Sequence, residues 1–422
     1  MFLHIDIDCF FVSAERSIAP ELKGIPVAVG GRSNLDIFDR KPVHIRLIDE
    51  NSGAFVAPVF YAGKKESFDS FFVDRVGDVK KIRGIITTSS YEARSFGVKT
   101  AMPVAQALKI CPQLIVVPPK YMLYHRLSHQ IYLFIQKKIP QVEQYSIDEF
   151  FGDVNGWIDD KDAYMFAMDL QEELLELFDI PVSIGISRAK WIAKLATSSA
   201  KPFGVYEVKN IDAFIEDIPI EEFPGIGRSF KKRLRSYNIY KLGEIKQRKM
   251  LFYSWKKPGI QLYHRIMGSD HESISRRAER KSIGISRTFD KISDSGEIRR
   301  RIMIMARNVV YMATAINANP TKYYLKINYE YGIKVKQSKR VERIFSETLF
   351  KSVLSQMYDE IVRVGAGAIK ISIAVSDFIS NNPRTLSMLD LNEDIKQSRL
   401  TKYMQKLRDR FGLDIIKSGS EF

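Results

Sequence analysis

The sequence predicts an α+β protein of several domains, and three observations support this fold class. The chain has 422 residues, which at roughly 100–200 residues per domain gives two to four domains. Apolar residues make up 45% and charged residues 27%, a composition typical of chains that build large cores rather than of disordered ones. Strand-like and helix-like segments alternate, and between residues 281 and 376 their order is that of a four-stranded sheet backed by two helices.

The N-terminal half begins with a strand and continues as mixed α and β structure. Apolar and polar residues alternate over residues 2–8, the period of a strand with one buried face. Asp6 lies on the polar face, and Asp8 is placed to cap a helix that begins near Cys9. Residues 32–83 show no clear period. Further strands are expected at 25–31, 85–88, 141–147, 150–154 and 181–187, and helices at 121–139, 160–178 and 188–199.

The C-terminal half follows a strongly basic stretch over residues 223–281, in which Ser275–Lys281 suits an exposed linker. Beyond it the pattern predicts a βαββαβ module. Its elements are a strand at 281–289, a helix at 295–317, strands at 322–331 and 333–345, a helix at 347–363 and a strand at 368–376. The tail from 380 to 422 is expected to be partly flexible, with one helix near 393–410.

The charge balance favours a polyanionic partner. The net charge is +15, which fits nucleic acid or an anionic membrane, although a merely basic soluble protein has the same balance. No uninterrupted apolar run approaches the 18 residues of a membrane span, and the first residues are not those of a signal peptide. Cys9 and Cys111 have no metal-binding spacing, which fits a reducing, cytoplasmic location.

Three carboxylates are candidates for a metal site. Asp148 and Glu149 are flanked by apolar residues on both sides, so they are expected close to a core, where a cation would have to neutralise them. Adjacent side chains of a regular strand point to opposite faces, so the two acids converge only at a bend or a sheet edge. With Asp6 they would suit two Mg²⁺ ions about 3.5–4 Å apart. The alternative is that Asp148 and Glu149 are turn residues facing solvent.

Several basic residues are candidates for binding phosphates. Arg94 can form a bidentate pair with phosphate oxygens, Tyr91 can add a hydroxyl, and Lys201 is a point charge. Taken alone, each is an ordinary surface residue. The turn at residues 223–227 carries glycines that let backbone N–H groups approach a phosphate at a helix N-terminus. It indicates a helix-hairpin-helix contact to a DNA backbone, or otherwise a plain αα-turn; its candidate contact residues are Gly225, Gly227, Arg228 and Lys231.

Together these motifs resemble the Y-family DNA polymerases, the DinB/UmuC-like translesion enzymes. The resemblance covers nearly the whole chain in order, through residues 3–11, 91–98, 146–149, 185–204 and 223–227. It implies a right-hand polymerase with a ferredoxin-like palm, small fingers, a helical helix-hairpin-helix thumb and a βαββαβ little finger. The expected boundaries are palm 1–11 and 120–208, fingers 12–119 with an insertion at about 34–83, thumb 209–275, linker 276–282, little finger 283–380 and C-terminal tail 381–422.

The resemblance also implies roles for single residues. Asp6, Asp148 and Glu149 would be catalytic and, with the Ile7 carbonyl, would hold two Mg²⁺ ions, with Mn²⁺ as an alternative. Phe11 would be the steric gate against a ribose 2′-hydroxyl. The nucleotide site implied in this way comprises Phe10, Phe11, Thr88, Tyr91, Arg94 and Lys201, and Lys281 joins the residues expected on DNA.

The partners implied by the resemblance are primer-template DNA and dNTPs, bound by a monomer without a membrane. A peptide for a sliding clamp is only partly matched, since Leu386, Met388 and Leu389 lack the usual Gln and Phe. Two other functions remain open. A non-catalytic DNA-binding protein would need no acids facing phosphates, and a nucleotidyl cyclase would need neither the phosphate-binding turn nor the long basic stretch.

Overall fold

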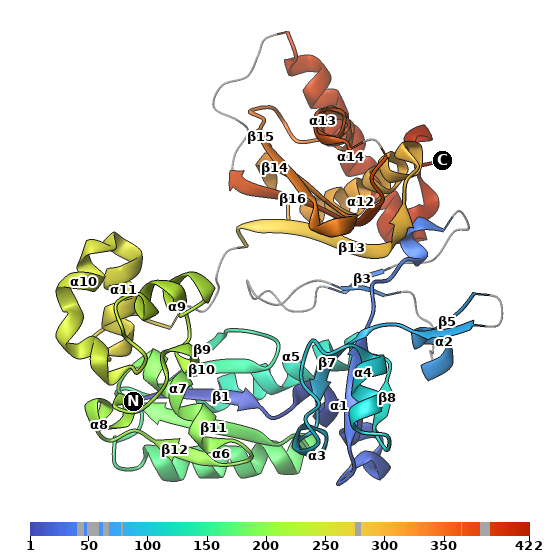
Figure 1. Ribbon diagram of the computed structural model, residues 1–422. Coiled ribbons are helices and arrows are strands. Elements are labelled where there is room, and N and C mark those ends of the chain that lie inside the picture. The colour runs from blue at the N-terminus through green and yellow to red at the C-terminus, as the bar shows by residue number, and fades with distance from the viewer. Residues whose placement is uncertain are drawn as a thin grey trace. The chain divides into compact units, whose positions relative to one another are not determined.

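The computed structural model in Figure 1 describes residues 1–39, 46–48, 59–61, 67–76, 79–274, 280–363, 365–379 and 389–422. By packing, the chain forms two units. Among the described residues, the first comprises 1–30, 73–76 and 79–274, and the second comprises 31–39, 46–48, 59–61, 67–72, 280–363, 365–379 and 389–422. No helix within the described ranges is both long and apolar enough to cross a bilayer.

A five-stranded sheet with the order β12-β11-β1-β10-β9 forms the centre of the first unit. Strand β1 is antiparallel to both its neighbours, whereas β11 and β12 run parallel. The alternation over residues 2–8 and the hairpin near residue 148 are therefore confirmed. The strands are β1 (Phe2–Ile7), β9 (Gln141–Gln144), β10 (Glu149–Asp153), β11 (Val182–Ser187) and β12 (Val205–Glu207).

The two faces of this sheet have different chemistry because β1 alternates. Leu3, Ile5 and Ile7 pack into an apolar core with residues of α5 (Tyr121–Lys138) and α6 (Ala163–Phe178). The other face of β1 carries His4 and Asp6, and α7 (Lys190–Ala200) packs against this strand. Helix α7 can lie this close to the sheet because residue 185 on the neighbouring strand β11 is glycine. A Cβ at Gly185 would lie 2.1 Å from the Ala193 carbonyl oxygen of α7.

Two smaller bodies complete the first unit. One is a three-stranded sheet with the order β7-β2-β8, together with short helices and the ribbon β5-β6. Its elements are α1 (Phe10–Ile18), β2 (Val27–Gly31), β5 (Val73–Val76), β6 (Val79–Ile82), β7 (Ile85–Ser89), α3 (Tyr91–Ser95), α4 (Val104–Ile110) and β8 (Ile115–Val117).

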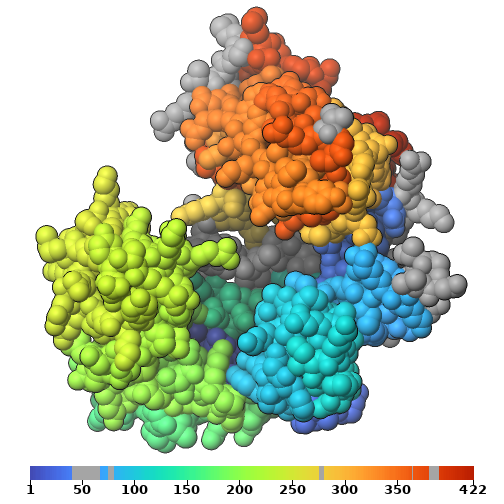
Figure 2. Space-filling model, in the orientation of Figure 1, coloured from blue at the N-terminus to red at the C-terminus, as the bar shows by residue number. Residues whose placement is uncertain are grey.

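The other body is helical and has its own core, which includes one side of α7. Its helices are α8 (Ile211–Ile215), α9 (Arg228–Arg235), α10 (Lys249–Ser254) and α11 (Lys256–Ile266). In Figure 2 the surface of the first unit is hollowed between this helical body, in yellow-green, and the body that contains α3 and α4, in cyan.

The second unit contains an antiparallel sheet with the order β13-β16-β14-β15. Helices α12 and α13 contribute to its core, as the βαββαβ prediction requires. The elements are β13 (Ser282–Ile292), α12 (Ser295–Ala315), β14 (Asn319–Tyr329), β15 (Lys334–Arg340), α13 (Glu347–Ile361), β16 (Ala368–Ile379) and α14 (Leu391–Phe411).

Of the C-terminal tail that was expected to be partly flexible, residues 380–388 lie outside the described ranges and residues 389–422 are described. Helix α14 confirms the helix expected near 393–410, but the chain beyond it is also packed, since Leu413 and Glu421 are buried. A buried glutamate needs a cationic partner, and Arg307 of α12 provides one, with its Nε 2.7 Å from a Glu421 carboxylate oxygen. A sequence pattern cannot show this pairing between residues more than a hundred positions apart.

Part of the insertion expected in the fingers packs instead with the C-terminal module. Ile37 and Phe38 are almost fully buried in the core of the second unit. The Phe38 ring lies edge-on to Phe289, with the ring centroids 6.3 Å apart, and Arg287 Nε donates to the Asn34 carbonyl oxygen at 3.0 Å. The second unit also includes β3 (Arg46–Ile48), β4 (Val59–Tyr61) and α2 (Phe68–Phe72).

Candidate active site

Asp6 and Glu149 lie directly opposite each other on neighbouring strands. Asp6 is the penultimate residue of β1, and its Cα partner on β10 is Glu149. Opposed residues of an antiparallel pair point to the same face, with Cβ atoms about 4.5–5.5 Å apart. Both carboxylates therefore lie on the polar face of the sheet, beside α7.

Asp148 reaches the same place because it precedes the regular strand. Residues 146–148 form a bend before β10 begins, so the opposite-face rule does not apply to Asp148. Ser146 Oγ donates to Asp148 Oδ1 at 2.5 Å and lies 3.5 Å from Glu149 Oε2, while the Ile7 N–H donates to the Asp148 carbonyl oxygen at 2.9 Å. The bend that the sequence required for convergence is present.

The electrostatics of this cluster favour neutralisation by cations. Burial, opposed by the charge of Lys201 and reinforced by the carboxylates of Asp148 and Glu149, raises the pKa of Asp6 to about 7. Burial also raises the pKa of Asp148. Buried carboxylates that raise each other's pKa are stabilised by a positive charge placed between them.

In the structure two lysines provide that charge. Lys201 Nζ lies 2.5 Å from Asp6 Oδ1, and Lys194 forms an ion pair with Glu149. Within the described ranges, no three or more Asp, Glu, His or Cys side chains are grouped closely enough to hold a metal ion. The donors are nevertheless hard carboxylate oxygens, which suit Mg²⁺, so a metal would take the place of the ammonium groups.

His4 lies beneath this cluster and is neutral. Its Nδ1 is 2.8 Å from Thr197 Oγ1 on α7, and its Nε2 is 3.4 Å from Lys194 Nζ. Burial, followed by the charges of Lys194 and Lys201, holds the pKa of His4 well below its usual value. The neutral His4 ring therefore contacts the Lys194 ammonium group without adding positive charge to the cluster.

Asp8 does not cap the first helix as the sequence predicted. Helix α1 has Cys9 at its N-cap and no side-chain capping bond. The buried Asp8 carboxylate instead accepts three hydrogen bonds: from the Tyr91 hydroxyl at 2.9 Å, from Ser183 Oγ at 2.8 Å and from the Phe203 N–H at 2.8 Å. The only sequence signal for this role is that Asp8 shares a face with Asp6 at the end of the strand.

The proposed phosphate-binding residues gather around this junction. Asp8 joins Tyr91, at the start of α3, to the turn that contains Lys201 and Phe203. Arg94 is exposed, with its guanidinium 4.8 Å from the centre of the Tyr91 ring, and its Nε donates to the Ser89 carbonyl oxygen at 3.1 Å. Tyr91 and Phe203 thus share Asp8 as a partner, and Lys201 lies two positions before Phe203.

Two adjacent phenylalanines on α1 have different surroundings. Phe11 is half-buried, and its ring stacks on Tyr124 with centroids 4.5 Å apart and planes at 13°. Tyr124 is itself fixed by a 2.6 Å bond from its hydroxyl to Glu15. Phe10 is buried in the core, which leaves its side chain no open surface for a nucleotide. Thr88, on β7, is half-buried.

The glycine turn leads directly into helix α9, and the Gly227 N–H donates to the Gly225 carbonyl oxygen at 3.0 Å. Gly225 has φ of +101°, a conformation that favours glycine, and Gly227 is the N-cap of α9. Arg228 is exposed, whereas Lys231 forms an ion pair with Glu221 at 2.9 Å. Lys281, directly before β13, is exposed.

The residues of the expected clamp peptide lie mostly outside the described ranges. Leu386 and Met388 fall between residues 379 and 389, and Leu389 is 97% exposed.

Three family models match the chain in order along its length. The model described as the impB/mucB/samB family matches residues 5–198. The IMS family HHH motif matches residues 208–239, and the impB/mucB/samB family C-terminal domain matches residues 280–388.

Curated relatives and solved structures show the same likeness. A protein named DNA polymerase IV from Shewanella frigidimarina is 32% identical over 298 residues, which cover 68% of this chain and 69% of that protein. Another of that name, from Oceanobacillus iheyensis, is 29% identical over 99% of this chain and 91% of its own. Among solved structures, a Y-family DNA polymerase chimera has a TM-score of 0.69 at 22% identity, covering 90% of this chain and 99% of its own.

Proposed function

Because the chain belongs to the Y family of DNA polymerases, the group described by the impB/mucB/samB model, we propose that it extends a primer on damaged template DNA. The substrate class is the dNTPs, the acceptor is the primer 3′-hydroxyl, and the setting is DNA repair and damage tolerance. Relatives named DNA polymerase IV support this assignment.

The convergence of Asp6, Asp148 and Glu149 is the observation that carries the proposal. Asp6 and the adjacent pair Asp148 and Glu149, from two distant parts of the sequence, lie near one another, an arrangement that costs stability unless cations neutralise it. Two Mg²⁺ ions held by these carboxylates and the Ile7 carbonyl would supply Lewis acidity to the primer hydroxyl and the triphosphate.

Lys201, which pairs with Asp6, has a second role in this proposal. If metal ions neutralised the carboxylates, the Lys201 ammonium group would no longer be needed at Asp6 and could bind a triphosphate oxygen. Arg94 adds its exposed guanidinium, a bidentate phosphate partner. The Tyr91 hydroxyl has one proton, which it donates to Asp8, so a triphosphate would have to compete for it.

Phe11 is proposed as the residue that selects deoxyribose. Stacking on Tyr124 restricts the Phe11 ring, and a restricted ring can exclude a 2′-hydroxyl by contact. Phe10 would act from the core, by packing against Phe11 at a centroid distance of 5.6 Å.

The DNA contacts proposed for the chain are sequence-independent. Gly225 and Gly227 would let the turn backbone approach a phosphate, which would have to compete with the Gly225 carbonyl oxygen for the Gly227 N–H (3.0 Å), while Arg228, Lys231 and Lys281 would add charge. Binding of a sliding clamp near Leu389 is a separate hypothesis. The proposed domains are palm 1–11 and 120–208, fingers 12–119 without the parts of the insertion that pack in the second unit, thumb 209–275 and little finger 283–380.

Primer extension tests the proposal directly. On undamaged and abasic templates with Mg²⁺, we expect distributive synthesis by the wild type and none by Asp148→Asn or Glu149→Gln, with primer-template binding retained. Asp153→Asn, on the same strand β10, is the matched control and should extend normally. Equal extension by Asp148→Asn and the wild type would refute the carboxylate assignment. Product from ATP or GTP without primer would indicate a cyclase instead.

A further inference from the structure

Helix α14 packs with its polar side inward and its apolar side outward. Asp394, Thr401, Gln405 and Arg408 are buried against the rest of the second unit. The exposed side carries Leu400, Tyr403, Leu407 and Phe411, whose side chains are 47%, 63%, 45% and 46% exposed. Spacings of three and four residues put these four on one face, here called the α14 stripe.

Charge pairing holds the helix in this orientation. Arg408 Nη1 lies 2.6 Å from the Glu347 carboxylate on α13, and Arg343 Nη2 lies 2.7 Å from Asp394. The Glu347 N–H donates to Thr401 Oγ1 at 3.1 Å. Turning the helix to bury its apolar side would leave these charges unpaired, so the outward stripe is a fixed feature of the surface.

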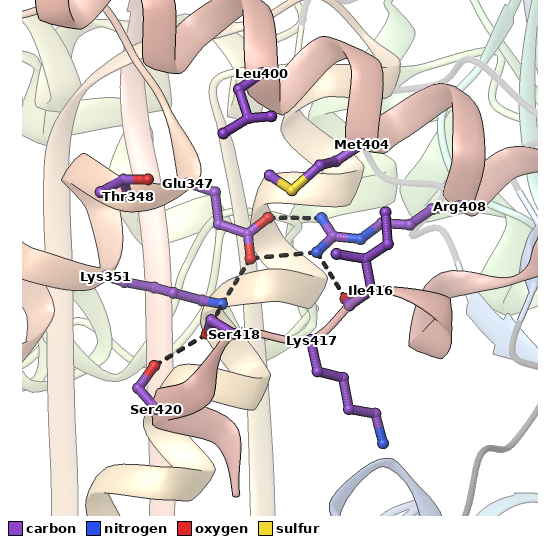
Figure 3. Close-up of a pocket in the computed structure, with 10 residues that line it drawn as sticks. All are labelled: Glu347, Thr348, Lys351, Leu400, Met404, Arg408, Ile416, Lys417, Ser418 and Ser420. Atoms are coloured by element: carbon purple, nitrogen blue, oxygen red, sulfur yellow. Dashed lines mark hydrogen bonds and ion pairs between the residues drawn. The ribbon is translucent and has the colours of Figure 1, made fainter.

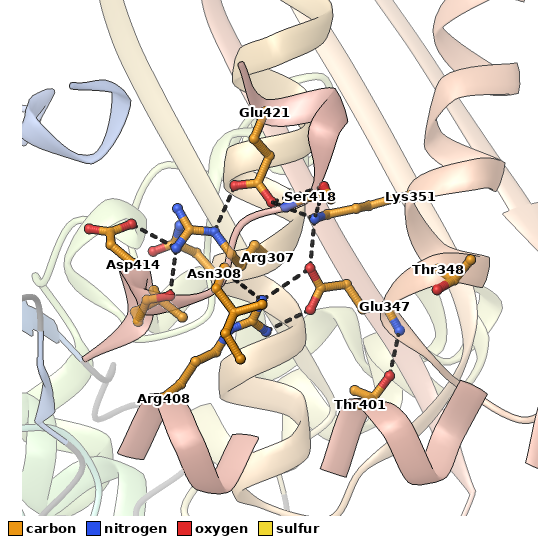
Figure 4. A network of polar contacts seen from close by, with 12 residues as sticks. Arg307, Asn308, Glu347, Thr348, Lys351, Thr401, Arg408, Asp414, Ser418 and Glu421 are labelled. Carbon is orange, nitrogen blue, oxygen red and sulfur yellow. Dashed lines mark hydrogen bonds and ion pairs between the residues drawn. The ribbon is translucent and has the colours of Figure 1, made fainter. Parts of the chain in front are cut away.

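The polar network continues to the C-terminus, as Figure 4 shows. Lys351 Nζ joins the Glu347 and Glu421 carboxylates at 2.6 Å each, and Arg307 pairs with Glu421 and with Asp414. The last residues of the chain thereby form a wall beside α14.

A cavity of about 270 Å³ lies between α13, α14 and this wall (Figure 3). Leu400, Met404 and Ile416 provide its apolar lining, while Lys351 and Arg408 are engaged in the network described above. In Figure 3 the Lys417 side chain points away from that network. Leu400 belongs both to the cavity and to the α14 stripe, so the two form one continuous apolar surface.

The other flank of the stripe is strongly basic. It carries exposed Lys396, Arg399, Lys402, Lys406 and Arg410. The exposed acids of the helix are Glu393 and Asp409, and Asp409 accepts a hydrogen bond from Tyr311 at 2.8 Å. The surface next to the apolar stripe is therefore positive.

We propose that the α14 stripe and its cavity bind an acidic amphipathic helix of a partner protein. A contiguous apolar surface beside charged residues is typical of a protein interaction site, and helix-in-groove recognition uses anchors at this spacing. The basic flank selects acidic groups on the partner.

Two other occupants fit the surface less well. Single-stranded DNA would use aromatic rings for stacking, and the stripe offers Tyr403 and Phe411. Leu400, Met404 and Leu407 have no ring, however, and the cavity between α14 and the C-terminal wall is concave. A second copy of this chain would bring the same basic flank against itself.

A labelled peptide tests the proposal on the full-length protein. The probe is a fluorescein-labelled synthetic helix of about five turns, with Leu at positions i, i+3, i+4 and i+7 and Glu elsewhere, and its control is a scrambled peptide of the same composition. By anisotropy we expect the amphipathic peptide to bind at least about tenfold more tightly than the control. Hydrogen exchange should show protection within residues 391–418.

Variants locate the binding site. Leu407→Glu and Tyr403→Glu should each weaken peptide binding about tenfold, whereas Leu177→Glu, an exposed leucine of α6, should not change it. In the double variant Lys402→Glu, Lys406→Glu, the affinity for the peptide should depend less on salt concentration than in the wild type. Circular dichroism establishes that each variant is folded, and primer extension should be unchanged.

Three results would overturn the proposal. The first is equal binding of the scrambled peptide. The second is oligo-dT binding that is weakened by Leu407→Glu while peptide binding is unaffected, which would assign the stripe to DNA. The third is a concentration-dependent dimer that is lost in Leu407→Glu, which would assign it to self-association.

Discussion

Replacing Asp8 by alanine should weaken nucleotide binding far more than it slows the chemical step. The Asp8 carboxylate is 2% exposed and accepts hydrogen bonds from Tyr91, Ser183 and Phe203. A hydrogen bond to a charged group contributes about 1.5–3 kcal/mol. Asp8→Ala releases Tyr91 and the turn beside Lys201 from a shared anchor, while Asp6, Asp148 and Glu149 keep their positions.

The Asp8 carboxylate accepts one such bond from the fingers side, from Tyr91, and two from the palm side, from Ser183 and Phe203. If Asp8→Ala weakens nucleotide binding by the energy of one such hydrogen bond, about 1.5–3 kcal/mol, kcat/KM for dNTP should fall by about 10- to 100-fold. Most of it should be a rise in KM. Single-nucleotide insertion under steady-state and single-turnover conditions separates KM from kcat.

A double-mutant cycle with Tyr91→Phe tests whether Asp8 acts through Tyr91. We expect the effects of the two changes to be non-additive, because they remove the same hydrogen bond. Ser183→Ala serves as the matched control, since it removes one bond to the same carboxylate without touching the fingers side. An unchanged KM in Asp8→Ala, or additivity with Tyr91→Phe within about 0.5 kcal/mol, would refute the positioning role.

Other predictions follow from single contacts. Phe11→Ala should admit ribonucleotides, and an unchanged rNTP/dNTP ratio of kcat/KM would remove Phe11 as the gate. Lys201→Ala should raise the KM for dNTP about tenfold while primer-template affinity, measured by anisotropy, stays constant. Burial opposes the shift, but the surrounding cations lower the pKa of Glu347 and Glu421. The ionised carboxylates therefore stabilise the folded state at neutral pH, and this contribution to the free energy of unfolding should be lost progressively below about pH 4.3. Urea unfolding at pH 7 and pH 4 would show the loss. Phe38→Ala should destabilise the second unit by about 3–5 kcal/mol, and calorimetry that detects no change would contradict its place in the core.

The parts of the fold that the sequence predicted correctly are those with a local pattern. Alternation fixed the face on which Asp6 lies, and it required a bend at Asp148 that the structure contains. The βαββαβ order followed from periodic segments of normal length. These features depend on neighbours in the sequence, which a periodicity can report.

The parts that were missed depend on contacts between distant residues. Asp8 was assigned to a helix cap because its three partners lie 83, 175 and 195 positions away. The pairing of Lys201 with Asp6 has the same character. Helix α14 was placed correctly, but its periodicity would favour burial of Leu400 and Leu407, whereas buried ion pairs turn these residues outward.

The burial of Ile37 and Phe38 in the second unit affects how that unit can be isolated. The family model for the C-terminal domain matches residues 280–388, a range without these two side chains. A fragment cut at residue 280 would expose the apolar surface around Phe289 to water and would be prone to aggregate. Supplying a separate peptide that spans residues 31–39 should restore its solubility, as in other proteins reassembled from two pieces.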